Sequence, residues 1–269
     1  IHKSVHTAIL LSVVIGAFLS AAGFFLSKPM LQYMSTPDYL IDLSDVYLKT
    51  YFLGMIPYMV YNFAAAILRA AGESQKPLYY LLVSGPVKIL LTFFFTKVIP
   101  LDVAGLALAT NLSQTLAAAL VIIELMKRND DCKLILSKLR FHKAELSQIL
   151  RLGIPSGIQS ATFSLSSVVI QAQINSFSLL NGFIAGDSAA TSIVQFANVI
   201  TGAYHHTAMA FVGQNVGAGR YDRVKRVYYV SLAASTVFVV ISSMLICIFA
   251  KPLLSIYITD SPEAISWGQ

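Results

Sequence analysis

Charged residues are scarce in this chain of 269 residues. Asp, Glu, Lys and Arg make up 12% of it, about half of the roughly 25% that soluble globular domains carry. Hydrophobic residues make up 56%. Buried helices of a soluble protein would show polar stripes every three to four residues, and most of the long apolar stretches here lack them. The composition therefore excludes an ordinary soluble domain and indicates an integral membrane protein.

Cysteine is also rare, and the motifs of several enzyme classes are missing. Cys132 and Cys247 show no paired spacing, so neither a disulfide framework nor a zinc site is indicated. No glycine-rich phosphate loop of the GxxxxGKS or GxxxxGKT type, nucleophile–base pair or metal-spaced His/Cys cluster is visible. We therefore expect no enzyme, no cofactor and no metal site, and any active transport would have to draw on an ion gradient.

Long intervals without Asp, Glu, Lys or Arg are the main positive feature. A helix needs about 20 residues to cross the ~30 Å hydrocarbon core of a bilayer. Seven intervals, one of them interrupted by Lys88, are long enough: 4–27, 50–68, 77–96, 103–123, 152–186, 188–219 and 227–250. The sequence thus predicts an all-α integral membrane protein, a polytopic helical bundle with seven spans.

The hydrophilic segments between these intervals alternate in charge. One set holds 14 of the 19 Lys and Arg residues, at Lys3 and within 69–76, 127–151 and 220–226. The other set is mainly acidic, with carboxylates within 38–45, at Asp102 and Asp187 and within 260–263. The positive-inside rule predicts that loops 69–76, 127–151 and 220–226 are cytoplasmic. The net charge of +6 then reflects topology, and no nucleic acid partner is expected.

An internal repeat indicates how the spans are organised. Residues 25–38 recur as 248–262 at a constant offset of 223, which aligns Lys28-Pro29 with Lys251-Pro252. Completing both copies gives six spans per half, twelve in total, with both halves in the same orientation. Transporters use such parallel repeats and place the substrate path between them. The expected parts are a first-lobe portion with four spans, a basic cytoplasmic linker, and a second-lobe portion with three spans and the start of a fourth, at 1–127, 128–151 and 152–269. A first residue other than Met fits an internal fragment.

Several segments resemble the multidrug and toxic compound extrusion (MATE) family. They are ILRAAGESQKP (67–77), DVAGLALAT (102–110), LGIPSGIQSATFSLSSVVIQAQINSF (152–177), IAGDSAATSIVQF (184–196) and FVGQNVGAGRYDRV (211–224). The resemblance implies about helices three to nine of a two-lobed, twelve-helix transporter. It implies a monomeric antiporter of the bacterial inner membrane that exports amphipathic or cationic drugs in exchange for Na⁺ or H⁺ by a rocker-switch mechanism.

Lys88 is an ionisable residue near the middle of the third interval, and ionisable residues inside spans are functional candidates by default. The resemblance implies that Lys88, Thr92 and Thr110 lie in the region of the family's first-lobe cation site. The family usually has Asn at the first position and Asp or Asn at the second. Two interpretations remain open: Lys88 lines the central cavity, with its ammonium in place of a bound cation, or it forms a structural pair between helices.

Two later spans carry polar faces and supply the candidate substrate-cavity residues. Gln195, Asn198 and His205 recur at helical spacing on one face. His205 is either a proton relay, since imidazole titrates near neutral pH, or a hydrogen-bonded packing residue. The preceding span carries two neighbouring polar stripes that include Gln159, Ser166, Gln171 and Gln173. Such a face avoids lipid, so it lines a cavity or packs on another helix.

Glycine and proline mark places where the helices end or bend. The glycines at 213, 217 and 219 predict the end of a span and a tight turn. Pro57, Pro86 and Pro155 predict kinks, either static or acting as hinges.

One alternative function is a lipid-linked oligosaccharide flippase of related architecture. Such a protein would need several basic residues in its cavity to hold a pyrophosphate, and only Lys88 qualifies.

Overall fold

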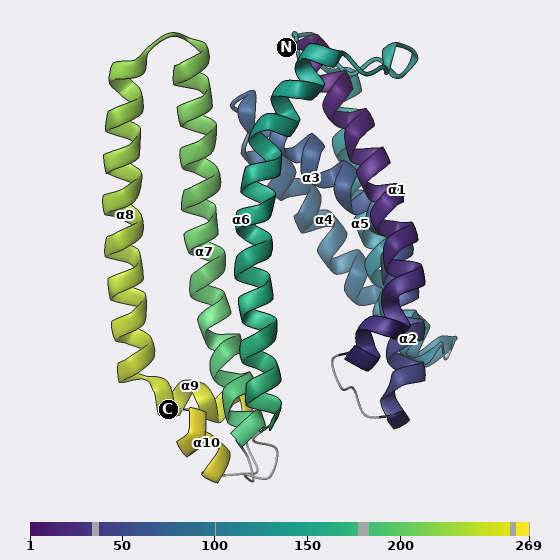
Figure 1. Cartoon of the computed structure of the whole chain (residues 1–269), viewed down its shortest axis with the longest axis vertical. Coiled ribbons are helices and arrows are strands. Elements are labelled where there is room, and N and C mark those ends of the chain that lie inside the picture. Colours follow the sequence, from purple (N-terminus) through teal and green to yellow (C-terminus); the bar gives the residue numbers. More distant parts are fainter. Residues whose placement is uncertain (34–37, 100, 177–182, 259–261, 269) are drawn as a thin grey trace. The chain divides into compact units, whose positions relative to one another are not determined.

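The computed structural model describes residues 1–33, 38–99, 101–176, 183–258 and 262–268, in which every regular element is helical (Figure 1). The all-α fold is therefore confirmed. Contacts divide the chain into two compact units, residues 1–157 and 158–269. The long helix α6 (Lys143–Ser176) crosses this division.

Three helices, at 2–33, 55–70 and 102–127, supply most of the closely packed core of the first unit. Its elements are α1 (His2–Tyr33), α2 (Asp38–Leu53), α3 (Met55–Ala70), α4 (Gln75–Phe93), a π-helical turn η1 (Phe94–Val98), α5 (Asp102–Lys127) and a 3₁₀ turn η2 (Leu136–Lys138). α1 packs on α2 and α3, and α5 packs on α2, α3 and α4. Ala64, Leu68, Val121 and Leu125 are fully buried at this core. Small residues allow the helices to approach closely.

Gly16 and Gly54 mark close contacts in this unit. A Cβ atom at Gly16 would lie 2.7 Å from the Ile56 Cα, so α1 touches the backbone of α3. The α2–α3 pair is bent by 46° across Gly54. The Gly54 amide bonds to the Tyr51 carbonyl, and the Thr50 carbonyl accepts a hydrogen bond from Asn111 Nδ2 of α5 at 2.6 Å. The break in this span is thus stabilised from a neighbouring helix.

Two acidic segments expected between spans are helical instead. Asp42 and Asp45 lie in α2, and Asp187 lies near the start of α7. Asp42 pairs with Lys28 at 3.2 Å and Asp45 with Lys49 at 2.7 Å, so their charges are compensated within the helical structure. The prediction that these acidic residues lie in segments between helices was therefore wrong.

The second unit contains most of α6, α7 (Phe183–Gly217), α8 (Tyr221–Ile248), α9 (Ala250–Tyr257) and α10 (Pro262–Gly268). α7 packs along α8, and α10 packs on α7. A Cβ at Gly186 would lie 2.4 Å from the Ala264 carbonyl oxygen, so only glycine permits this contact. α7 ends at Gly217, and Gly219 has a φ of 69° before α8 begins. The predicted glycine turn is confirmed.

The two copies of the repeat share buried positions but differ in polarity. At the offset of 223, Leu31 matches Leu254 and Ile41 matches Ala264, and all four are buried. The polar pair Ser27–Asp45 of the first copy corresponds to Ala250 and Gly268 in the second. The two segments thus keep apolar residues at the same two buried positions, while only the first carries the buried Ser–Asp hydrogen bond.

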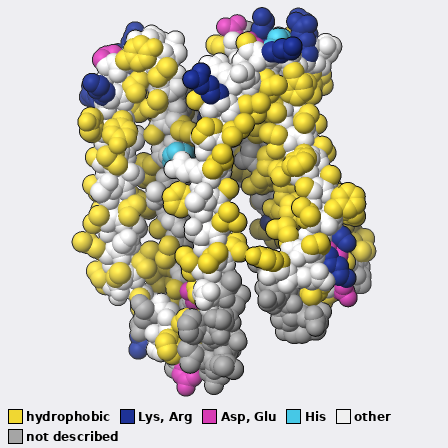
Figure 2. All heavy atoms as spheres, viewed as in Figure 1, with side chains coloured by type: hydrophobic (Ala, Val, Ile, Leu, Met, Phe, Trp, Pro, Cys, Tyr) yellow, Lys and Arg dark blue, Asp and Glu magenta, His cyan; other side chains and the backbone are white. Residues whose placement is uncertain are grey.

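Four described helical stretches are long and apolar enough to cross a membrane: α1, α4 with η1, α5 and α8; the bent α2–α3 pair would be a fifth. The other two predicted spans correspond to α6 and α7. With 34 and 35 residues these helices are long enough, but their Ser, Thr, Gln, Asn and His residues keep them below that apolar requirement. Figure 2 shows hydrophobic side chains spread along the helices, with Lys and Arg mainly near helix ends.

Candidate functional site

The candidate residues of α6 lie on a helix that packs extensively against no other described element. Gln159, Ser166, Gln171 and Gln173 are all exposed. Five hydroxyl groups of this helix each donate to the carbonyl four residues earlier: Ser156, Thr162, Ser164, Ser166 and Ser167. These local bonds satisfy the hydroxyls without a partner helix. α6 can therefore present a polar face while its backbone stays helical.

The candidate residues of α7 share one side of an unbroken helix. Gln195, Asn198 and His205 are exposed, and a Cβ at Gly202 on the same side would meet nothing within 4 Å. The His205 ring lies 5.8 Å from the ring of His206. Between α7 and α8 His205 also lines a pocket of about 290 Å³ with Tyr204, Tyr228, Ser231 and Ser235, among others. An ionisable imidazole and several hydroxyl groups thus share one cavity.

The candidate cation-site residues lie on two helices that pack together, α4 and α5. Lys88 is exposed near the middle of the helical stretch Gln75–Val98. The Thr110 hydroxyl donates to the Leu106 carbonyl at 3.0 Å, and the Thr92 carbonyl accepts from Thr96 at 2.8 Å. Among the described residues, no hydrogen bond joins these three side chains, and no ion pair involves Lys88. The structure therefore places the three residues on neighbouring helices without assembling a closed site.

An ion-pair network that the sequence did not reveal joins α4 to the end of α5. Lys76 Nζ lies 2.6 Å from Glu124 Oε1 and 3.2 Å from Glu73 Oε1. The Tyr80 hydroxyl donates to Glu124 Oε2 at 3.1 Å. Lys76 and Glu124 are 48 residues apart, so only the tertiary fold brings them together.

Arg128 extends this network into the loop after α5. Its guanidinium lies 3.6 Å from Glu73 and makes hydrogen bonds to both carboxylate oxygens of Asp130. The hydrogen bond from Arg128 lowers the pKa of Asp130. Burial raises the pKa of the nearby Cys132 thiol. The network therefore fixes the end of α5 and the start of the linker.

Asp45 is a buried carboxylate that the sequence placed in a loop. It is 7% exposed and accepts hydrogen bonds from the Ser27 hydroxyl and from Lys49 Nζ. The Lys49 ammonium also lies 5.6 Å from the centre of the Phe24 ring, a cation–π distance. All the hydrogen bonds that Asp45 accepts here come from α1 and α2, which makes a structural role the direct interpretation.

The segment between α5 and α6 is attached to α1 through two buried side chains. His6 Nε2 accepts a hydrogen bond from the Ile135 amide at 3.1 Å, while His6 Nδ1 lies 2.7 Å from the His2 carbonyl oxygen. Thr7 Oγ1 accepts from the His142 amide at 3.2 Å. The only sequence signal for this attachment was a pair of polar residues at the start of an apolar span.

The family comparison agrees with this all-helical membrane architecture. A model of the family described as MatE matches residues 1–94 and 155–269, well over half of the chain. The chain belongs to the MATE family. This family is one of multi-pass membrane transporters and not of enzymes.

The MATE chain has relatives described as drug-resistance proteins. It is 30% identical over 251 residues to the "Probable multidrug resistance protein YpnP" of Bacillus subtilis, covering 93% of this chain and 55% of the relative. It is 27% identical over 267 residues to the "Probable multidrug resistance protein YoeA" of the same organism, covering 95% and 56%. It is also 23% identical over 266 residues to the "FAD transporter" of Shewanella oneidensis, covering 97% and 58%. The chain thus spans a little over half the length of these relatives.

Solved structures show the same fold. A transporter of the MOP superfamily from Pyrococcus furiosus matches with a TM-score of 0.85 and 18% identity, covering 99% of this chain and 59% of the other. A multidrug resistance MATE transporter in an outward-facing conformation matches with a TM-score of 0.83 and 18% identity, covering 98% and 60%. At this identity, the likeness concerns the helical fold.

Proposed function

We propose that this MATE-family protein exports amphipathic or cationic organic compounds from the cell in exchange for Na⁺ or H⁺. Transport would use rocker-switch alternating access in the plasma membrane, with loops 69–76, 127–151 and 220–226 on the cytoplasmic side. The observation that carries the proposal is the similarity, over more than 90% of the chain, to two probable multidrug resistance proteins. The family itself identifies a transporter but not its cargo or its coupling ion.

The polar faces of α6 and α7 support a substrate path. In the bilayer, exposed polar side chains are tolerated where they face protein or a water-filled cavity. Gln159, Ser166, Gln171 and Gln173 of α6 and Gln195, Asn198 and His205 of α7 form such faces. Amide and imidazole groups suit amphipathic substrates, because they accept and donate hydrogen bonds without adding a fixed charge.

Coupling would involve one of two ionisable groups. His205 carries an imidazole, a group that can act as a proton carrier, and it lines a pocket. Lys88, with Thr92 and Thr110 nearby in the fold, would hold a fixed positive charge in the first lobe in place of a bound cation. Proton coupling through His205 and substitution of a cation by Lys88 are compatible, since the two residues lie in different units.

A second candidate is the transport of an anionic substrate. The observation that favours it is Lys88, an exposed ammonium at mid-helix that pairs with no described carboxylate within 4.0 Å. One relative is described as a transporter of FAD, which is an anion. A lipid-linked oligosaccharide flippase would fall in the same class. Lys88 is one charge, so the drug-export proposal remains the better supported.

The test is drug accumulation in an efflux-deficient bacterium that expresses the full gene. Ethidium and a fluoroquinolone are measured with and without Na⁺ and proton gradients. We expect accumulation severalfold below that of the empty vector, restored when the coupling gradient collapses. Accumulation equal to the empty vector under every gradient, with the protein present in the membrane, would overturn the proposal.

Two variants assign the coupling group. His205→Gln should abolish dependence on the proton gradient, while His206→Gln, the matched neighbour on the same helix, should keep it. Lys88→Asn should change the Na⁺ or pH dependence of export. If both dependences stay as in the wild type, Lys88 has no cavity role in coupling.

A further inference from the structure

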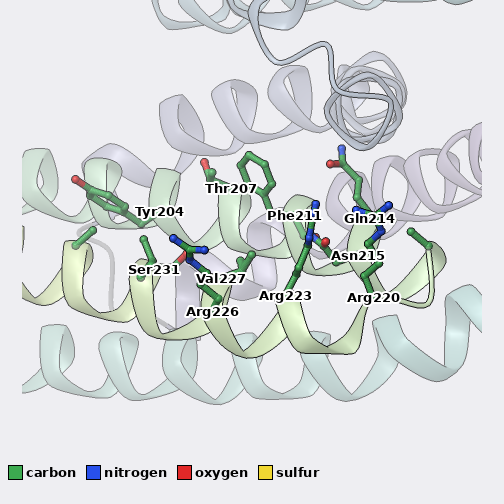
Figure 3. Close-up of a pocket in the computed structure, with 13 residues that line it drawn as sticks. Tyr204, Thr207, Phe211, Gln214, Asn215, Arg220, Arg223, Arg226, Val227 and Ser231 are labelled. Atoms are coloured by element: carbon green, nitrogen blue, oxygen red, sulfur yellow. The ribbon is translucent and has the colours of Figure 1, made fainter.

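A pocket of about 820 Å³ lies where α7 and α8 meet at the glycine turn (Figure 3). Its lining belongs entirely to the second unit. Arg220, Arg223 and Arg226 line one part of it. Tyr204 and Phe211, among others, line the rest. The pocket therefore combines a cluster of positive charges with an aromatic surface.

The local structure explains why three arginines meet here. Gly219, with its φ of 69°, turns the chain, and the Arg220 amide donates to the Asn215 carbonyl at 2.8 Å. α8 then begins, and residues three apart lie on the same side of a helix. Figure 3 shows Arg220, Arg223 and Arg226 along one side of α8, reaching towards α7. Lys225, which lies between them in sequence, does not line the pocket.

None of the three guanidinium groups lies within 4.0 Å of a described carboxylate, although Asp222 lies in the same turn of α8. None of the ion pairs between described residues involves them. Like charges one turn apart repel each other, so an anion in the pocket would relieve this repulsion. The positive-inside rule alone requires basic residues near this end of the spans, but not three of them in one cavity.

The position and the lining indicate which anion fits. Arg220 is the N-cap of α8, and Arg223 and Arg226 lie in its first two turns. α8 is long and apolar enough to cross a membrane, and the ends of such a helix lie at the level of the lipid headgroups. Guanidinium groups bind phosphate through paired hydrogen bonds, and basic pockets between spanning helices bind anionic headgroups. Phe211, Val227 and Val230 offer apolar surface beside the charges. We propose that this pocket binds the phosphate of an anionic phospholipid from the membrane leaflet.

The experiment measures binding of fluorescent phosphatidylglycerol to the purified full-length protein in neutral detergent. We expect Arg220→Gln, Arg223→Gln and Arg226→Gln each to weaken binding about fivefold, the effect of one basic residue near an anionic surface. Lys225→Gln is the matched control: it removes the same charge from the same turn but outside the pocket, and it should change binding less than twofold. A thermal melt of each variant checks that it is folded.

Three further outcomes decide the proposal. Fluorescent phosphatidylcholine should bind at least tenfold more weakly than phosphatidylglycerol; equal binding would overturn a phosphate-charge site. Loss of affinity in Lys225→Gln equal to that in Arg223→Gln would reduce the effect to general surface charge and overturn the pocket. Soluble glycerol 1-phosphate should compete poorly; complete displacement at micromolar concentration would identify a soluble phosphate ligand and overturn the membrane source. If Arg223→Gln melts early, Arg223→Lys should retain the charge and most of the binding.

Discussion

The two units of this MATE chain differ in how their helices are held. In the first unit, α5 buries eight residues, and ion pairs join its end to α4 and the adjoining loop. In the second unit, α8 has no buried residue. A small core of Ala189, Ile193 and Leu254 lies near the N-terminal end of α7. The candidate polar faces of α6 and α7 and the arginine pocket all involve the more open helices. The described helices of the first unit are therefore fixed largely by one another, whereas those of the second unit make few contacts within this chain, which spans a little over half the length of its relatives.

The largest expected effect comes from adding volume where the first unit is tightest. Gly16→Val should destabilise the protein by about 3 kcal/mol, because its side chain would meet the α3 backbone, which cannot move aside easily. Gly202→Val in α7 is the matched change, since its Cβ would meet no described atom of another helix within 4 Å. Thermal melts in detergent measure both. Equal losses in the two variants would remove the contrast between the units.

Removal of the amide that stabilises the break in the α2–α3 span should have the next largest effect. Asn111→Ala deletes the 2.6 Å hydrogen bond to the Thr50 carbonyl. Leaving a partly buried carbonyl unpaired should cost about 2 kcal/mol. Thr115→Ala is a suitable comparison, since its exposed hydroxyl bonds only within α5. Denaturation midpoints that match for the two variants would show that Asn111 does not support the break.

Glu124→Gln should have a smaller effect in the ion-pair network. The change keeps the side-chain shape but weakens the contacts to Lys76 and Tyr80. Solvent reaches part of this pair and screens it, so the expected loss of stability is about 1 kcal/mol. The melt should be repeated at high salt, which reduces the difference between wild type and variant if the interaction is ionic. A difference that is independent of salt would argue for packing instead.

The smallest effect concerns thiol chemistry at the start of the linker. Burial raises the pKa of Cys132, so the unreactive thiol form persists to higher pH than in a free cysteine, whose pKa is about 8.5. In a Cys247→Ser background, maleimide labelling of Cys132 should be slower than in the denatured protein at pH 7.5. The difference should shrink as the pH rises through the raised pKa. Equal rates at pH 7.5 would place Cys132 in open solvent.

The sequence predicted the features that depend on local pattern. The apolar intervals became helices, and the glycines at 217 and 219 ended α7 and formed the turn. The polar side of α7 follows directly from helical spacing, as expected for Gln195, Asn198 and His205. These outcomes need only neighbours a few residues apart.

The features that the sequence missed depend on pairs that are distant along the chain. The Asp45 carboxylate can be buried within a helix because Ser27 and Lys49 donate hydrogen bonds to it. Lys76 pairs with Glu124, 48 residues later in the chain, and a contact at this separation cannot be predicted from sequence periodicity. α6 and α7 contain long intervals without charged residues, but they are not apolar enough to count as candidate spans, because Ser, Gln and Asn are uncharged yet polar. Their polar faces, which avoid lipid, already mark both helices in the sequence.

The attachment of the linker to α1 has a consequence for dividing the protein into separately expressed halves. His6 and Thr7 bond to Ile135 and to the backbone of His142, so the stretch up to His142 belongs with the first helix. A cut near 128–133 would place residues 134–142 on a different polypeptide from α1. The hydrogen bonds of His6 and Thr7 to this segment would then have to form between two separate chains. A cut directly after His142, where α6 begins, would keep the attachment intact. The position directly after His142 is therefore a better place to divide the chain than the charged stretch at 128–133, because it preserves these two hydrogen bonds.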